Sequence, residues 1–211
     1  TNFVGEKKGK IFKSAPEFTN NKFFDECKIN YAENCLTRDD DDDAIIFHSE
    51  KKIKRNYSWR ELKSAVLKFA NYLKNNNIEK NDRIAAILPN IPETVISFLS
   101  TAQLGAIWSS CSSDFGKKAI IDRFKQIEPK VLLFSDYYFY NNKKVDTTKV
   151  IKDVLHNIPS IEKIILIPYE FNETDYQLDF EYDNLCKILQ QEISYSKFEK
   201  FNFNHPLYIL Y

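Results

Sequence analysis

Apolar residues along the chain form short continuous runs, and segments with helical spacing lie between them. The runs have the length and composition of buried strands and lie at 83–88, 106–111, 131–134 and 164–167. In the intervening segments apolar positions recur every three to four residues, which predicts helices at 92–102, 118–127 and 148–155. Strands that are apolar throughout are typical of a parallel sheet covered on both faces. The predicted fold class is therefore α/β, with right-handed βαβ units and a doubly wound, mostly parallel sheet.

A capping box marks the start of a further predicted helix. Ser58 and Glu61 stand three residues apart, so each side chain can accept a hydrogen bond from the other residue's backbone amide. One apolar stripe follows at helical spacing and consists of Leu62, Ala65, Val66, Phe69, Ala70 and Leu73. Asparagines at 75–77 are expected to end this helix, because asparagine tolerates the left-handed conformation.

The two ends of the chain are less regular. In the first part we expect a short helix over 30–36 with Asn30 as its N-cap, and a hairpin from 44–48 and 52–57. The acidic run at 38–43 lacks the spaced acids and central glycine of an EF-hand, so it predicts a solvated turn. The last part is expected to contain a loop at 169–183, a helix at 184–192 and a final strand at 207–211.

Composition restricts the class of protein. The 211 residues are 43% hydrophobic and 28% charged with a formal net charge of +0, which gives no reason to expect a nucleic-acid or anionic-membrane partner. No apolar run approaches the roughly 20 residues that span a bilayer, and the polar N-terminus lacks a signal-peptide core. We therefore expect a cytoplasmic protein. Its four cysteines and three histidines show no metal-ligand spacing, so no metal site is predicted.

Common catalytic and nucleotide-binding motifs are absent, including G-x-G-x-x-G after a strand, G-x-x-x-x-G-K-[ST], G-x-S-x-G and H-E-x-x-H. In a doubly wound sheet, ligands bind beyond the carboxyl ends of the strands. The segments in those positions are 89–92, 109–116 and 135–137. The serine-rich segment 109–116 is the most suggestive of a ligand site. Its local features nevertheless favour a tight turn whose hydroxyl groups satisfy backbone groups.

Several segments resemble the acetoacetate–CoA ligases, which belong to the adenylate-forming superfamily. INYAENCL at 29–36 is similar to LNYAENLL of these ligases, and GAIWSSCSSDFG at 105–116 to GAIWSSCSPDFG, with Ser113 in place of proline. DRFKQIEPKVL at 122–132 and HPLYILY at 205–211 resemble DRFGQIEPKVL and HPLWILY. Two further segments resemble sequence blocks of the wider superfamily, namely YSWREL at 57–62 and NDRIAAILPN at 81–90.

This resemblance implies ATP-dependent ligation of acetoacetate to CoA. The carboxylate attacks the α-phosphorus of ATP to give an acyl-adenylate and pyrophosphate, and the CoA thiol then displaces AMP. The implied cofactors are ATP, CoA and Mg²⁺, and the implied partners are the small-molecule substrates; no oligomeric state is indicated. Two alternatives stay open, namely another short-chain acyl-CoA synthetase (for acetate or propionate) and a noncatalytic α/β binding module.

The resemblance also implies a domain division. HPLWILY in the family runs directly into a glycine-rich phosphate loop, SSGTTGxPK, and the lysine that steers the carboxylate lies further downstream. We therefore expect the N-terminal part of the large adenylation domain, with 1–43 as an extension, 44–211 as the first α/β subdomain and the small C-terminal domain absent. No residue of this chain is expected to be catalytic, and the 211 residues alone are expected to be inactive.

One segment corresponds to a ligand site of the family. Related acetyl-CoA synthetases hold the nucleotide phosphates of CoA with a basic stretch after the third βαβ strand. The segment YFYNNKK at 138–144 resembles the corresponding Y-x-Y-N-G-K of acetoacetate–CoA ligases, so Lys143 and Lys144 are predicted to bind CoA. Asn142 replaces the usual glycine, which disfavours a close approach of the backbone to the ligand. The alternative is two exposed lysines on a loop.

Overall fold

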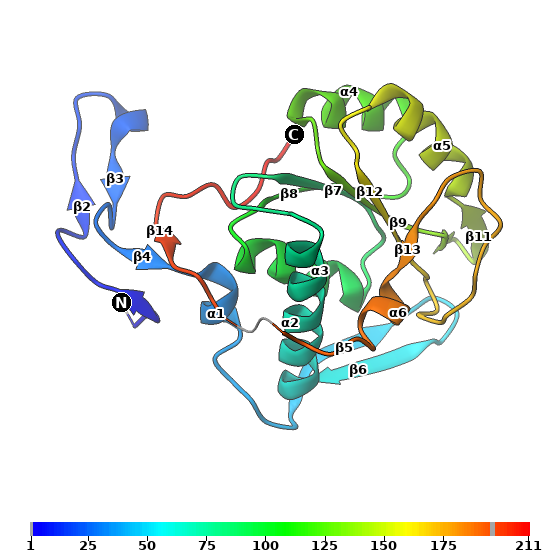
Figure 1. Ribbon diagram of the computed structural model, residues 1–211, viewed down its shortest axis with the longest axis horizontal. Helices are drawn as coiled ribbons and strands as arrows, with labels where there is room; N and C mark the ends of the chain where they lie inside the picture. Colours follow the sequence, from blue (N-terminus) through cyan, green and yellow to red (C-terminus); the bar gives the residue numbers. More distant parts are fainter. Residues whose placement is uncertain (1, 195–196) are drawn as a thin grey trace.

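A parallel β-sheet forms the centre of the protein (Figure 1). The computed structural model describes residues 2–194 and 197–211, so residue 1 of the predicted extension and residues 195–196 of the predicted subdomain lie outside the described residues. Within the described ranges this sheet has five strands in the order β13-β12-β9-β7-β8, and all neighbouring pairs are parallel. The strands are β7 (Arg83–Ile87), β8 (Ile107–Cys111), β9 (Val131–Ser135), β12 (Lys163–Ile167) and β13 (Asp183–Asn184). The predicted α/β class is confirmed.

Helices cover both faces of this sheet. They are α2 (Trp59–Asn75), α3 (Pro92–Gln103), α4 (Lys117–Ile127), α5 (Thr148–Asn157) and the short α6 (Leu185–Ile188). Ile84 and Ala86 of β7 pack in a core with residues of α2 and with α6, whereas Ala85 and Ile87 pack in a second core with α4 and α5. Alternate residues of one strand thus enter two different cores, which explains why the predicted strands are apolar throughout.

The long helix α2 begins and ends where the sequence predicts. The Glu61 amide donates to Ser58 Oγ over 3.2 Å, and the Ser58 amide donates to Glu61 Oε2 over 2.8 Å, which completes the capping box. All six residues of the predicted stripe are buried. Asn77 has a φ of 59° just after the helix, so an asparagine does take the left-handed conformation there.

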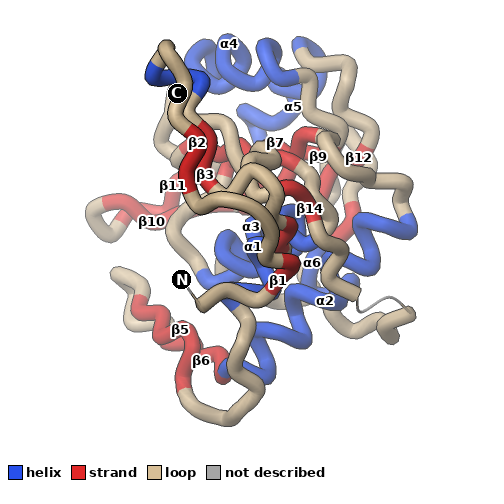
Figure 2. The backbone as a smooth tube through the Cα atoms, turned by 90° about the vertical axis from the view of Figure 1, so that its left-hand side faces the viewer, coloured by secondary structure: helices blue, strands red, loops and turns tan. Residues whose placement is uncertain are grey.

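Smaller elements surround the core. The predicted hairpin is present as β5 (Asp43–His48) and β6 (Lys54–Ser58), and the short helix α1 (Tyr31–Cys35) has the Asn30 side chain accepting from the Glu33 amide. The first residues form short strands, β1 (Gly5–Glu6), β2 (Phe12–Lys13), β3 (Lys22–Phe23) and β4 (Lys28–Ile29), with a 3-10 turn at Phe18–Asn20. A small antiparallel sheet pairs β4 with β1 and with β14 (Phe201–Asn202). The hairpin β2–β3 projects from the body in Figure 1 and lies in front of it in Figure 2.

Two predictions near the C-terminus are wrong. The helix expected over 184–192 is limited to Leu185–Ile188, because the Gln190 and Gln191 amides donate to the carbonyls three residues back and no longer continue the α-helical pattern. The strand expected over 207–211 is reduced to one isolated parallel bridge between Trp108 and Tyr208. The Ser109 hydroxyl donates to the Ile209 carbonyl over 3.0 Å, so a side chain occupies the acceptor that a continued ladder would use.

None of the helices in the described part of the chain is long and apolar enough to cross a membrane.

Candidate ligand site at the carboxyl end of the sheet

The strand order creates a switch point between β7 and β9. From β7 the chain passes through α3 to β8 on one side, and from β8 it passes through α4 to β9 on the other side of β7. In doubly wound sheets the crevice beyond the carboxyl ends of such neighbouring strands is the usual ligand site. The segments predicted from the sequence follow β7, β8 and β9, so the parallel arrangement places them along the same edge of the sheet.

Asp136 follows β9 and joins three segments at this edge. Its Oδ1 accepts from the amides of Tyr137 (2.9 Å) and Tyr169 (2.8 Å), and the Tyr176 hydroxyl donates to Oδ2. The residue is 3% exposed. Because both carboxylate oxygens already have protein donors, Asp136 positions the ends of β9 and β12 and is not a candidate ligand group.

Glu93 forms a buried ion pair at the other side of the switch point. It lies in the first turn of α3, is 0% exposed, and its Oε1 accepts from Arg55 Nη1 (2.7 Å) and from the Tyr57 hydroxyl (2.9 Å). Burial raises the pKa of Glu93 above its ordinary value, although the nearby Arg55 charge opposes this shift. The pair anchors the hairpin β5–β6 to the carboxyl end of the sheet.

The sequence interpretation missed this pair. The position of Glu93 in the first turn of a helix suited the helix dipole, and this local role was sufficient to explain it. The available signal was the spacing of Arg55 and Tyr57, which stand two residues apart on a strand and therefore point to the same side.

The serine-rich segment after β8 behaves largely as a turn, in agreement with its local features. The Phe115 amide donates to the Ser112 carbonyl over 3.2 Å, and Ser109 bonds the Ile209 carbonyl as described above. Burial raises the pKa of the Cys111 thiol to about 12, so this cysteine is not a thiolate at neutral pH. Trp108 is 6% exposed and packs edge-on against Phe98, with ring centroids 6.0 Å apart. These contacts support structural roles.

Lys143 and Lys144 lie on a hairpin, for which the sequence analysis predicted no strands. The hairpin consists of β10 (Tyr137–Tyr140) and β11 (Lys143–Asp146), and its turn residues Asn141 and Asn142 have φ values of 48° and 61°. Positive φ at both central positions is the mark of the type I′ turn, which asparagine adopts readily. The Asn–Asn pair therefore supplies the conformation for which glycine is commonly used.

The hairpin separates the two lysines. Successive residues of a strand point to opposite faces, and here Lys143 pairs with Tyr140 while Lys144 pairs with Phe139. The ammonium of Lys144 lies 3.5 Å from the ring centroid of Tyr137. The two side chains are exposed but do not converge from one face, and their predicted binding of CoA stays a prediction.

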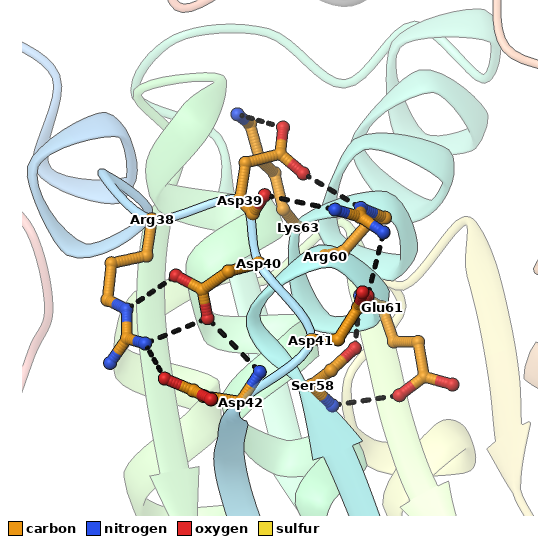
Figure 3. A network of polar contacts seen from close by, with 9 residues as sticks. All are labelled: Arg38, Asp39, Asp40, Asp41, Asp42, Ser58, Arg60, Glu61 and Lys63. Carbon is orange, nitrogen blue, oxygen red and sulfur yellow. Dashed lines mark hydrogen bonds and ion pairs between the residues drawn. The ribbon is translucent and has the colours of Figure 1, made fainter.

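The acidic turn before β5 is exposed and neutralised by neighbouring cations (Figure 3). Arg38 bonds Asp40 and Asp42, while Arg60 bonds Asp41. In residues 2–194 and 197–211, no group of three or more histidine, cysteine or acidic side chains is arranged to hold a metal ion. The four cysteines, Cys27, Cys35, Cys111 and Cys186, are free thiols.

The fold, with its switch point between β7 and β9, is that of a doubly wound α/β protein, and its candidate ligand site lies at the carboxyl ends of the strands. A family model described as "AMP-binding enzyme" matches residues 32–211. This match covers most of the chain, and the chain belongs to the AMP-binding enzyme family.

Individual relatives point to one branch of that family. Acetoacetyl-coenzyme A synthetase from Rhizobium meliloti (strain 1021) is 35% identical over 210 residues, which are 99% of this chain and 32% of the relative. Acetoacetyl-CoA synthetase from Xenopus tropicalis is 33% identical over 202 residues, 90% of this chain and 30% of the relative. The solved structure of acetoacetyl-CoA synthetase from Streptomyces lividans superposes with a TM-score of 0.87 at 29% identity, covering 100% of this chain and 32% of that chain. The chain thus spans about a third of the length of these relatives.

Proposed function

We propose that the protein ligates acetoacetate to CoA in an ATP-dependent reaction that proceeds through an acyl-adenylate. The observation that carries this proposal is the similarity to acetoacetyl-CoA synthetases along nearly the whole chain, at 35% identity to the Rhizobium meliloti protein. The agreement in fold with the Streptomyces lividans enzyme, at a TM-score of 0.87, supports it independently of motif matching. The proposed cofactors are ATP, CoA and Mg²⁺, and the proposed location is the cytoplasm.

Within that reaction we assign scaffold and CoA-binding roles to this chain. Residues 1–43 form an extension, and 44–211 form the first subdomain of the adenylation domain. The exposed ammonium groups of Lys143 and Lys144 fit the phosphates of the CoA nucleotide, because both can reorient as mobile point charges. The described residues offer no metal-ligand group, so no residue of the chain is assigned to Mg²⁺.

The substrate is tested by comparing CoA-ester formation from acetoacetate, acetate and butyrate in the protein of natural length. We expect acetoacetate to give the highest kcat/KM. A preference for acetate contradicts the acetoacetate assignment and favours an acetyl-CoA synthetase. If no ester forms from any of the three acids, the noncatalytic binding module is favoured.

The CoA assignment is tested by Lys143→Ala and Lys144→Ala. We expect the KM for CoA to rise about two- to fivefold with Lys143→Ala, as for loss of one exposed charge contact. The effect of Lys144→Ala should be smaller, because its ammonium already contacts the Tyr137 ring. Lys149→Ala, an exposed lysine on α5, is the matched control. An unchanged KM for CoA in both hairpin variants contradicts the assignment.

A further inference from the structure

The tips of two hairpins meet although they are far apart in the sequence. Glu50, in the turn between β5 and β6, accepts a hydrogen bond through Oε2 from the Asn142 amide over 2.8 Å. The neighbouring Lys51 ammonium lies 5.7 Å from the ring centroid of Phe139. Two adjacent residues of one turn therefore contact the turn and one strand of the hairpin that carries Lys143 and Lys144.

The backbone amide of Asn142 is not needed for the hydrogen bonds within its own hairpin. In a two-residue turn the residue after the turn donates back across it, whereas the amides of the central residues point outward. An outward amide next to Lys143 in the chain is suited to an anionic oxygen. In this structure the anionic oxygen at the Asn142 amide belongs to Glu50.

We propose that Glu50 is an internal competitor for the anion site at the tip of the β10–β11 hairpin. A phosphate group that binds the Asn142 amide and Lys143 must first displace the Glu50 carboxylate. Glu50 therefore weakens the binding of phosphate-bearing nucleotides. This inference rests on the proposed CoA-binding role of the hairpin.

The expected effect of Glu50 on nucleotide affinity is small, because the residues involved are exposed to water. Both Glu50 and Asn142 are exposed, so water and salt weaken their interaction, and its displacement costs little. Glu50 is therefore expected to tune the affinity and not to block the site. Removing its charge should tighten nucleotide binding about two- to fivefold, and this gain should shrink as the salt concentration rises.

The test measures the dissociation constant of adenosine 3′,5′-bisphosphate, the nucleotide part of CoA, by titration calorimetry with the protein of natural length. Glu50→Ala removes both the charge and the acceptor, and Glu50→Gln removes the charge alone. Glu17→Ala is the matched control, because it removes one exposed acidic charge near the hairpin β2–β3, which lies far from β11 in Figure 1. We expect tighter binding with both Glu50 variants, more so with Glu50→Ala, and no change with the control.

Lys143→Ala separates the two proposals. If Lys143→Ala weakens binding while Glu50→Ala leaves it unchanged or weakens it, the CoA-binding role stands and the competitor role of Glu50 is overturned. If Lys143→Ala leaves binding unchanged but Glu50→Ala tightens it, the anion site lies at the Asn142 amide and the lysine assignment is overturned. If Glu17→Ala tightens binding as much as Glu50→Ala, the effect is one of overall charge, and the competitor role is again overturned.

Discussion

Two groups of charged side chains stabilise the region around the hairpin β5–β6, and they differ in their exposure to water. In one group Arg55 pairs with Glu93, and the side chains of these two residues are 15% and 0% exposed. In the other, Arg60 pairs with Asp39 and Asp41, whose side chains are 55% and 79% exposed (Figure 3). Both groups pair an arginine guanidinium with carboxylates, so they differ mainly in how far the charges are buried.

Burial determines what happens when one partner is removed. Arg55 Nε and Glu93 Oε2 are buried without a hydrogen-bond partner among the described residues, so this pair depends on the bonds it does make. Loss of either side chain leaves an uncompensated charge in a poorly solvated place, which is strongly destabilising. In the exposed group, water replaces a lost partner at little cost.

The largest expected effect follows from Glu93→Ala. The Arg55 guanidinium would lose its carboxylate and stay half-buried between the rings of Phe47 and Phe171, 5.1 and 5.6 Å from their centroids. We expect the free energy of unfolding to fall by about 3–5 kcal/mol, measured by urea denaturation. Glu79→Ala, which removes an exposed carboxylate, is the control. A loss no larger than that of the control contradicts the role assigned to burial.

A smaller effect is expected from Ser58→Ala, at the border between the two groups. This change removes the hydroxyl that accepts from the Glu61 amide at the start of α2. A helix N-cap of this kind contributes about 1 kcal/mol. The free energy of unfolding should fall by that amount, and Ser58→Thr should restore most of it. Equal stability of the alanine variant and the original protein would show that the cap contributes nothing here.

The comparison also predicts opposite responses to pH. Burial raises the pKa of Glu93 above 4.5, so protonation of this carboxyl favours the folded state. This proton-linked part of the stability is complete below pH 4.5 and is lost as the pH rises through the raised value, whereas the bonds of Glu93 to Arg55 and Tyr57 remain. The bond from Arg38 lowers the pKa of Asp40 below 3.8, so its contribution is present above pH 3.8 and is lost as the pH falls through the lowered value. Urea midpoints measured across this range should fall with rising pH in the original protein, as Glu93 ionises. This fall should be absent in Glu93→Gln. The same decline in that variant would assign it to another group.

The smallest effect is expected from Asp39→Asn in the exposed group. Asp39 contacts Lys63 (3.0 Å) and Arg60 (3.4 Å), but all three side chains are accessible to water. We expect no measurable change in the urea midpoint at moderate salt, because exposed pairs are screened. A destabilisation comparable with that of Glu93→Ala would remove the distinction on which the comparison rests.

Features that depend on local sequence were predictable. The strands β7, β8, β9 and β12 follow from apolar runs, and the start of α2 follows from Ser58 and Glu61, whose side chains contact each other's backbone. The candidate edge of the sheet followed from strand order together with the rule for carboxyl ends. The family followed from motifs that the comparisons confirm.

Features that depend on distant contacts were not predictable. Arg55 and Glu93 are 38 residues apart, and Glu50 and Asn142 are 92 residues apart, so no local pattern joins them. The carbonyl of Leu189, just after α6, bonds Lys68 of α2, and the carbonyl of Ile209 bonds Ser109, so distant residues contact both of the segments that were wrongly predicted. The hairpin β10–β11 is an intermediate case, because the Asn–Asn turn signal was present but no strand was predicted on either side of it.

The central proposal is that the protein adenylates acetoacetate. Exchange of labelled pyrophosphate into ATP by the protein of natural length reports that step alone, without CoA. We predict exchange that depends on acetoacetate and is faster than with acetate or butyrate at equal concentration. Exchange that is absent with acetoacetate, or faster with acetate, would contradict the claim.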